Sequence, residues 1–320
     1  MSTTIEQSFI ISPEHHGLRL DQALSQLLTD YSRSQIKQWI LDKEILVNGQ
    51  AIRPRDKVQL DDTVTLAVTL KVKQEDKPQD LPLDIVYEDD ELLIINKPVG
   101  AVVHPGAGNQ DSTLLNALLH HYPDIATIPR AGIVHRLDKD TSGLMVIAKT
   151  LSSHHYLVDA MQQRLIKREY LAITNGTFIS GGTVDEPIGR HPKQRTQMAV
   201  SHNGGKPAIT HYRLAQKFRA HTYLRVQLET GRTHQIRVHM AHINHALVGD
   251  QVYGGRLHMP KGATPELREK LHSFKRQALH ATKLTFTHPV NQQEICQEAT
   301  PPEDFKQLLA TLECDNLTKR

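Results

Sequence analysis

The sequence predicts an α+β protein: a mixed, largely antiparallel β-sheet flanked by helices and loops, preceded by a small α/β domain. Residues 144–148 form a short apolar run rich in branched side chains, which is typical of a buried strand. Residues 220–229 alternate apolar and polar side chains, the pattern of a strand with one buried face. Strands and helices do not alternate regularly along the chain, which favours this class over a parallel βαβ architecture.

Composition limits the classes of function. A length of 320 residues allows two domains, and the formal net charge of +3 is compatible with an RNA partner. Aromatic residues make up only 5%, which argues against a surface that stacks many bases. Two cysteines are too few for a disulfide framework or a thiolate zinc site, so we expect a reduced, cytoplasmic protein. We see no secretory signal and no apolar run of about 18 residues, so we expect no membrane contact.

The first part of the chain begins with residues 1–16, which we expect to be irregular. Four leucines at helical spacing predict a helix over residues 18–28, and a second helix is expected to begin at Ser32 or Ser34. Short strands are expected at 45–47 and 51–52, joined by a tight turn at Asn48-Gly49, and at 58–60 and 64–66. We therefore predict a small domain over residues 17–70.

A polar, charged segment at 71–80 is predicted to be a flexible linker, and residues 81–312 a second domain. This domain is expected to hold two strands within 84–98, a helix from Leu114, a helix capped by Ser152 and a strand at 168–173. Gly106 and Gly108 are not followed by a third glycine at the dinucleotide-binding spacing. We therefore expect no nucleotide cofactor.

A dense polar loop precedes the buried strand at 144–148. It holds five charged or imidazole side chains, then Thr141, Ser142 and Gly143, where glycine can let the chain turn back into the sheet. A solvated loop with local salt bridges is the simpler interpretation. So much charge against a core strand instead favours a functional loop.

A second polar block covers residues 230–242. Thr233 could cap a helix whose core-facing side chains are Ile236, Met240 and Ile243. Arg237 would then lie beside the buried face, where a cation is costly unless a carboxylate meets it. Asp138 is a candidate, and the pairing would hold it ionised as a nucleophile or base requires. A structural salt bridge elsewhere is the alternative.

Four histidines of this region raise the question of a metal site: His234, His239, His242 and His245. Their spacing does not reproduce His-Glu-x-x-His, and no glutamate lies between them. We therefore favour hydrogen-bonded structural histidines and expect no metal.

Both polar blocks resemble a known family. The run His-Arg-Leu-Asp-Lys-Asp-Thr-Ser-Gly-Leu at 135–144 resembles the signature of the RNA pseudouridine synthases that modify ribosomal RNA, and Gly-Arg-Thr-His-Gln-Ile-Arg at 231–237 resembles a second motif of that family. Similar stretches at 103–109, 190–192, 252–256 and 277–281 extend the resemblance over nearly the whole chain. Ser142 and Ala246 depart from it, standing where threonine and proline are usual.

The resemblance implies a role for five side chains. Asp138 would be the catalytic residue and Arg237 its partner, Tyr170 would stack on the target base, Leu247 would line the pocket, and Arg136 would replace the extruded base. From the residues alone, Tyr170 would sooner be an ordinary strand aromatic, and Leu247 could be plain core and Arg136 a loop salt bridge. The implied reaction is an isomerisation, so neither a redox cofactor nor a metal is needed.

The first domain resembles the S4-like RNA-binding domain. Arg19, Arg33, Lys37 and Arg53 are expected to contact RNA phosphates. The implied partner is 23S ribosomal RNA or a large-subunit assembly particle, with uridines of the helix 69 stem-loop at the subunit interface as targets and ribosome assembly as the process served. A monomer is the default.

Two other classes of function stay open on the residues. An RNA-binding assembly factor without an active site would tolerate replacement of Asp138. A metal-dependent RNA hydrolase would bind metal, and a chelator would abolish its cleavage.

Overall fold

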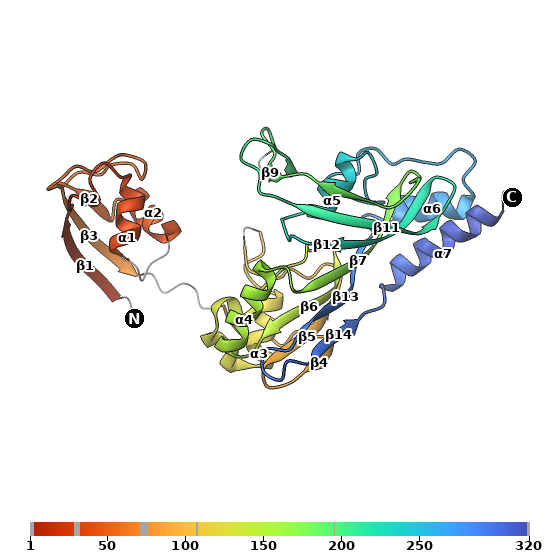
Figure 1. Ribbon diagram of the computed structural model, residues 1–320, viewed down its shortest axis with the longest axis horizontal. Helices are drawn as coiled ribbons and strands as arrows, with labels where there is room; N and C mark the ends of the chain where they lie inside the picture. Colours follow the sequence, from red (N-terminus) through yellow and green to blue (C-terminus); the bar gives the residue numbers. More distant parts are fainter. Residues whose placement is uncertain (1–2, 29–32, 71–75, 107, 195, 319–320) are drawn as a thin grey trace. The chain divides into compact units, whose positions relative to one another are not determined.

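The computed structural model describes residues 3–28, 33–70, 76–106, 108–194 and 196–318. The chain divides into two compact units, residues 1–75 and residues 76–320 (Figure 1). Among the described residues, no helix has the length and apolarity needed to cross a membrane.

The first unit is a three-stranded antiparallel sheet with two helices. Its strands are β1 (Thr3–Ile10), β2 (Ile45–Val47) and β3 (Thr63–Leu70), in the order β1-β3-β2. The helices are α1 (Leu20–Leu27) and α2 (Arg33–Leu41), as the leucine and isoleucine spacing predicts. Ser34 lies within α2 and does not precede it, and Ser32 lies outside the described residues. The core holds Leu20, Leu24, Ile36, Ile40, Val64 and Leu66.

Two expectations for this unit are wrong. Residues 3–10 are not irregular: they form β1, which pairs with β3 from Thr3–Leu70 to Ile10–Thr63. The local pattern is weak because an edge strand with exposed side chains is held mainly by backbone hydrogen bonds to a distant segment. Residues 58–60 are not a strand either.

The predicted turn at Asn48-Gly49 is present, but its hairpin is not. Both residues have positive φ, 51° and 76°, as a tight two-residue turn requires. Val47 and Gln50 exchange backbone hydrogen bonds of 2.9 Å across it. Residues 51–52 then leave the sheet, and β2 pairs with β3 instead.

The expected linker at 71–80 falls into two parts. Residues 71–75 lie outside the described residues. Beyond them, the Asn116 side chain donates to the Lys77 carbonyl (2.8 Å), and the Gln79 backbone N–H donates to the Asn116 carbonyl (3.0 Å). Asn116 lies in α3 (Leu114–His121), so residues 76–80 are part of the second unit rather than a free linker.

The second unit is built on a nine-stranded mixed sheet, and the predicted fold class is confirmed (Figure 1). The strand order is β4-β5-β6-β13-β7-β12-β11-β8, with β14 also paired to β13. Only β6 and β13 run parallel; the other neighbours are antiparallel. The strands are β4 (Ile85–Glu88), β5 (Leu92–Lys97), β6 (Ser142–Ala148), β7 (Lys167–Asn175), β8 (Gly182–Asp185), β11 (Ile209–Lys217), β12 (His221–Leu228), β13 (Leu279–Thr287) and β14 (Glu294–Glu298), while β9 (Ile188–Arg190) and β10 (Met198–Val200) pair separately.

Successive residues of the central strands contribute to different apolar clusters. In β5, Leu93 and Ile95 pack with α3 and with α5 (Gln235–His242), whereas Leu92 and Ile94 pack with α4 (Leu151–Gln162). A strand covered on both faces needs apolar residues at every position, which explains the continuous apolar run of β6. The Thr150 side chain caps α4, rather than the predicted Ser152.

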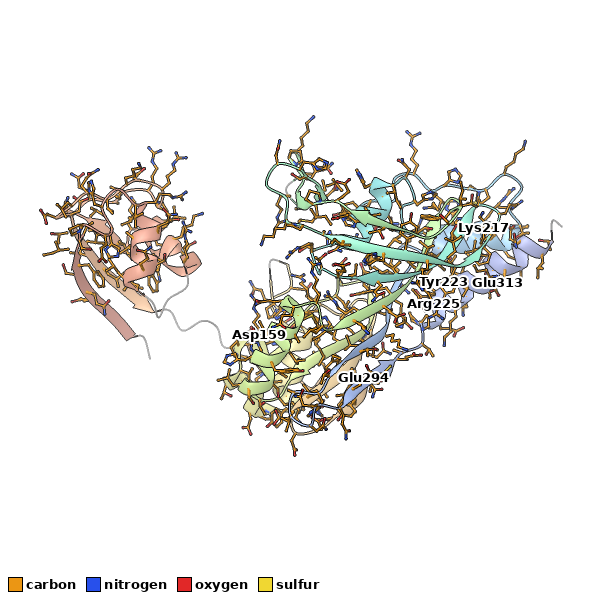
Figure 2. The ribbon with its side chains drawn as sticks, in the orientation of Figure 1. Asp159, Lys217, Tyr223, Arg225, Glu294 and Glu313 are labelled. Carbon is orange, nitrogen blue, oxygen red and sulfur yellow. The ribbon has the colours of Figure 1, made fainter. Side chains whose placement is uncertain are left out.

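The alternation predicted for 220–229 is present in β12. Leu224, Val226 and Leu228 are buried in the cluster that contains α5. On the other face, Tyr223 meets Phe305 edge to face, and Arg225 is exposed (Figure 2). Phe305 belongs to α7 (Glu303–Leu317), which packs there with α6 (Pro265–Ser273).

Candidate active site

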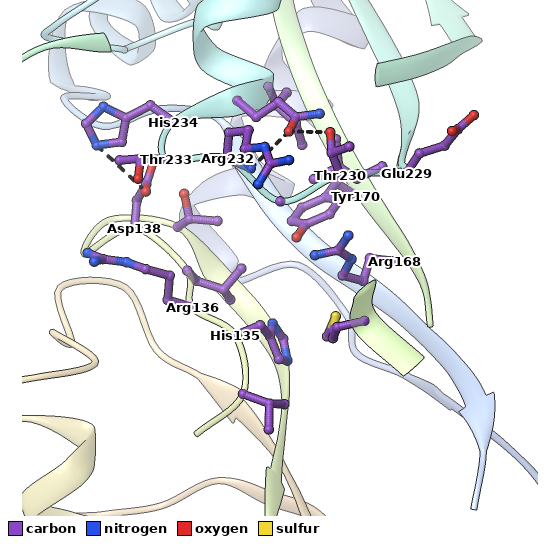
Figure 3. Close-up of a pocket in the computed structure, with 18 of the residues that line it drawn as sticks. His135, Arg136, Asp138, Arg168, Tyr170, Glu229, Thr230, Arg232, Thr233 and His234 are labelled. Carbon is purple, nitrogen blue, oxygen red and sulfur yellow. Dashed lines mark hydrogen bonds and ion pairs between the residues drawn. The ribbon is translucent and has the colours of Figure 1, made fainter. Parts of the chain in front are cut away.

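A pocket of about 780 Å³ lies between the loop before β6 and the segment that leads into α5 (Figure 3). Its walls hold residues 133–138 and 228–237, which overlap the two polar blocks singled out in the sequence, together with residues of β7 and β13. The two blocks lie far apart in the sequence. The sheet therefore brings together the side chains that the sequence pattern marks as functional.

The loop that carries Asp138 is tied down at several points. The backbone N–H of Val146 donates to His135 Nε2 (3.0 Å), and that of Thr141 donates to the Asp138 carbonyl (3.1 Å). The Gln277 side chain donates to Thr141 Oγ1 (2.9 Å). These contacts turn Asp138 into the pocket, whereas the side chain of Asp140 does not line it.

Lys97, at the end of β5, holds the same loop from below. Its side chain is fully buried, and its ammonium donates to the carbonyls of Pro98, Ala101 and Lys139 at 2.9–3.0 Å. Burial lowers the pKa of Lys97 to about 8, although the negative charges of Asp140 and Asp138 act to raise it. An ammonium with three carbonyl partners is well suited to fix a loop that has no strand partner of its own.

Gly143 lets the loop enter the sheet at close range. Its φ is +120°, and a Cβ atom there would lie 2.2 Å from the carbonyl oxygen of Ala281 in β13. Glycine is therefore required both by the backbone angle and by the approach of the two strands.

Arg237 of α5 reaches Asp138, as the sequence predicted. Its Nη1 donates to Asp138 Oδ2 at 3.0 Å, and only 7% of the Arg237 side chain is exposed. A second carboxylate completes the arrangement: Asp250 Oδ2 accepts from Nε (2.7 Å) and Asp250 Oδ1 from Nη2 (3.0 Å). Arg237 is thus clamped by Asp250 and presents its third nitrogen, Nη1, to Asp138.

The charges of this cluster support one another. Burial opposes ionisation of Asp250, but hydrogen bonds from Arg237 and from two backbone N–H groups hold its pKa below the ordinary value. Burial also opposes the charge of Arg237, but Asp250 and Asp138 outweigh it and raise the pKa of the guanidinium. Asp250 was not singled out in the sequence. The available signal was a carboxylate two residues after the apolar pair Leu247-Val248.

His234 and Tyr253 form the other side of the Asp138 environment. His234 Nε2 lies 3.8 Å from Asp138 Oδ1, and the two side chains face each other in Figure 3. His234 Nδ1 lies 2.8 Å from the Tyr253 hydroxyl. His234 precedes α5 with left-handed backbone angles, φ 57° and ψ 23°, and the predicted Thr233 cap is absent. A left-handed non-glycine residue is uncommon and often marks a functional constraint.

Tyr170 lies in β7 and lines the pocket beside Arg168 (Figure 3). It is 6% exposed, and burial raises the pKa of its hydroxyl. Burial also lowers the pKa of the neighbouring pocket residue His135 to about 3, so this imidazole is neutral near pH 7. Tyr170 thus lines the pocket as a neutral, largely buried phenol.

Arg136 and Leu247 have different outcomes. Arg136 is exposed at the pocket and makes no hydrogen bond or ion pair with any residue that the structure describes, so the loop salt bridge is not formed. Leu247 is 1% exposed and does not line the pocket. It belongs to the same apolar cluster as Tyr170, because the turn at 246–249 pairs with Thr174 and Ile173. Leu228, Ile236 and Leu279 are among the apolar residues that line the pocket instead.

The basic residues expected to bind RNA gather around the start of α1. Arg19 and Arg33 both donate to the buried carboxylate of Asp21, at 3.0 and 2.9 Å, while each stays about half exposed. Lys37 lies one turn after Arg33 on α2 and is exposed. Arg53 is exposed in the loop whose carbonyls at Pro54 and Asp56 accept from the first residues of α1.

Two of the histidines after His234 have separate structural partners. His239 lies between Thr210 Oγ1 and the Glu186 carbonyl (both 2.9 Å), and His245 Nδ1 lies 2.9 Å from the Asn175 carbonyl. Within the described part of the chain, no group of three or more His, Cys, Asp or Glu side chains is placed to hold a metal ion.

Comparison with known proteins matches both units. Residues 91–242 match the family model of RNA pseudouridylate synthases, and residues 18–64 match the S4 domain. Curated relatives named "Ribosomal large subunit pseudouridine synthase D" are 55% identical over 98% of this chain and 97% of their own length in Escherichia coli (strain K12) and Yersinia pestis.

Solved structures resemble the chain as well. Human RNA Pseudouridylate Synthase Domain Containing 4 has a TM-score of 0.56 at 25% identity, covering 72% of this chain and 92% of its own. Human RNA Pseudouridylate Synthase Domain Containing 1 has a TM-score of 0.53 at 25% identity, covering 73% and 89%.

Proposed function

The chain belongs to the RNA pseudouridylate synthase family, and we propose that it isomerises uridines of 23S ribosomal RNA, with Asp138 as the reacting carboxylate. The observation that carries this proposal is the Asp138 carboxylate, held at 3.0 Å by the buried Arg237 at the edge of a pocket of about 780 Å³. The relatives' printed name supplies the substrate class, large-subunit RNA. The uridines of the helix 69 stem-loop are the proposed targets.

The reaction rearranges bonds without adding or removing atoms. The bond from ribose C1′ to N1 of uracil breaks, the base turns, and C5 bonds to the same C1′ while the C5 hydrogen leaves as a proton and N1 gains one. Asp138 acts on the sugar as nucleophile or base, and a carboxylate does this best when it is ionised and fixed in position. Arg237 meets both needs, because its positive charge and its clamp by Asp250 hold the carboxylate in one orientation.

The target base must leave its stack, which costs roughly a few kcal/mol. Arg136, exposed and without a partner among the described residues, fills the gap left by the base. The detached ring stacks on Tyr170, with Leu228 and Leu279 beside it.

Residues 17–70 would bind the RNA, and residues 81–312 would carry out the reaction. Four exposed cations lie around α1 and α2, and they contact RNA phosphates: Arg19, Arg33, Lys37 and Arg53. The protein would act as a monomer in the cytoplasm, on 23S RNA or an assembling large subunit, and so support ribosome assembly.

The test maps pseudouridine in a large-subunit RNA transcript by chemical adduct and primer extension. We expect new sites with the wild type, none with Asp138→Asn, and wild-type sites with Asp140→Asn, which changes the same loop outside the pocket. If the naked RNA gives no sites, the same measurement is made on precursor large-subunit particles. Absence of sites on both substrates, or full activity of Asp138→Asn, would contradict the proposal.

A further inference from the structure

A second possible hydrogen-bond donor, the His234 imidazole, lies near Asp138 and has no role in the proposed reaction. Arg237 donates to Oδ2, and the Nε2 atom of His234 lies 3.8 Å from Oδ1. Whether His234 can serve this oxygen depends on which ring nitrogen carries its proton. The hydrogen bonds of Tyr253 decide that question.

The Tyr253 hydroxyl oxygen accepts from the backbone N–H of Met198 at 3.0 Å. Its own hydrogen is left for His234 Nδ1 at 2.8 Å, since Tyr253 has no other hydroxyl partner among the residues that the structure describes. Nδ1 therefore accepts, and the neutral imidazole carries its proton on Nε2. The opposite tautomer would leave the Tyr253 hydrogen without an acceptor and turn a nitrogen lone pair towards Asp138.

We propose that His234 is a positioning residue that holds Asp138 Oδ1 through its Nε2–H, and that Tyr253 keeps His234 in this neutral form. This inference rests on the proposed role of Asp138. The separation of 3.8 Å is longer than a hydrogen bond, but such contacts are often long before substrate binds and shorten in the complex. A small rotation of either side chain closes the distance.

The rest of the cluster favours this arrangement. Tyr253 is held in place by the Arg237 guanidinium 5.0 Å from its ring centroid and by the Asp250 carboxylate, which accepts from the Tyr253 backbone N–H. The charged groups facing His234 are Asp138, Arg237, Asp250 and Arg136. Burial lowers the pKa of His234; Asp138 opposes this shift and Arg237 adds to it. The ring is therefore neutral near pH 7. Burial raises the pKa of Tyr253, so its hydroxyl keeps its proton.

The proposal predicts how protonation of His234 behaves. Donation from Tyr253 to Nδ1 favours the neutral ring, so Tyr253→Phe raises the pKa of His234. A protonated His234 would pair with Asp138 and make this carboxylate a weaker nucleophile or base. The acid limb of kcat therefore moves to higher pH in Tyr253→Phe. His234→Gln, whose amide N–H can occupy the Nε2 position, removes the contribution of His234 to that limb.

The experiment follows release of tritium from RNA labelled at uridine C5, with the transcript or particle that the wild type modifies, across pH 5–9. We expect kcat to fall at least about tenfold in His234→Ala with KM unchanged, and less in His234→Gln. Tyr87→Phe, which also loses a tyrosine hydrogen bond but lies outside the pocket, keeps the wild-type profile. A change in KM alone for His234→Ala, or an unshifted limb in Tyr253→Phe, overturns the proposal.

A second measurement does not depend on activity. The pKa of His234 is titrated by NMR in protein labelled with ¹⁵N-histidine, its signal being identified by its loss in His234→Gln. We expect Tyr253→Phe to raise this pKa and Asp138→Asn to lower it, because the latter removes an anion. An unchanged pKa in both variants refutes the arrangement. If the wild type forms no pseudouridine, the proposed function fails and this titration still decides the role of Tyr253.

Discussion

Replacing Asp250 by asparagine tests how the buried clamp on Arg237 contributes to stability. The Asp250 side chain is fully buried and accepts four hydrogen bonds, two of them from Arg237 at 2.7 and 3.0 Å. Removing one partner of a buried ion pair costs about 3–5 kcal/mol. Arg237 keeps Asp138 as a partner, so we expect the lower end, about 3 kcal/mol. In a domain of roughly 150–250 residues this corresponds to a fall in Tm of roughly 6–12 °C.

Asp304→Asn is the matched control. Asp304 makes the same two-bond contact with the buried Arg276, at 2.7 Å for both bonds, but Asp304 itself is 44% exposed. Water can reach the vacated position, so its loss should cost less than that of Asp250, about 1–2 kcal/mol. The assay is urea unfolding followed by far-UV circular dichroism. Fluorescence of Trp39, the single tryptophan and part of the first unit, should report an unchanged transition in both variants. Equal losses for the two substitutions would falsify the assignment of the difference to burial.

This contribution also depends on pH in a defined direction. The pKa of Asp250 is lowered in the folded protein, so its stabilisation is present above the pKa of an unfolded aspartate, about 3.9. It is lost as the pH falls through the folded value. The difference between wild type and Asp250→Asn should therefore shrink in acid, and a difference that grows there would contradict the reasoning.

Three further predictions concern the loop that carries Asp138 and two residues that hold its ends. Gly143→Ala should cost about 3 kcal/mol or more, because its Cβ would lie 2.2 Å from a strand carbonyl, while Gly100→Ala, at φ +84° with open space, should cost about 1 kcal/mol in the same urea assay. Between about pH 8 and 10.5, Lys97 keeps its proton in the unfolded chain but has released it in the folded protein. Stability therefore rises with pH in this range, and the urea midpoint of the wild type should rise relative to that of Lys97→Met. A wild-type midpoint that falls relative to the variant would show the sign to be wrong. Arg136→Ala should leave Tm unchanged and lower kcat/KM about tenfold or more in the tritium assay, whereas an unchanged kcat/KM would remove Arg136 from the flipping step.

The sequence was sufficient where one short segment carries the whole pattern. The continuous apolar run of β6 and the alternation in β12 depend only on local burial, and both strands are present. The approach of Arg237 to Asp138 could also be expected, because a cation on a buried helix face requires a carboxylate. The motifs identified the residues, and the cost of burial suggested their pairing.

The sequence was insufficient where a partner lies far along the chain. β1 is held by β3, and its own residues carry little periodicity. Arg237 needed two carboxylates, but the pattern indicated only Asp138, because nothing local shows that Asp250 folds back on α5. Leu247 was placed at the pocket by resemblance, whereas the turn that contains it pairs with the end of β7 and buries Leu247 in the core. In each case tertiary packing decided the outcome.

The position of β13 in the sheet has a consequence for synthesis on the ribosome. This strand lies between β6 and β7, yet its residues, Leu279–Thr287, come near the end of the chain. Asp138 comes from the β6 side of the sheet and Arg237 from the β7–β12 side. Both residues precede Leu279 in the sequence, so both are synthesised before the strand that joins the two halves of the sheet. Pairing between strands that are distant in sequence is slow, and here it cannot be completed until β13 has been synthesised. A nascent chain that ends before residue 279 therefore contains every proposed reacting group but no assembled active site.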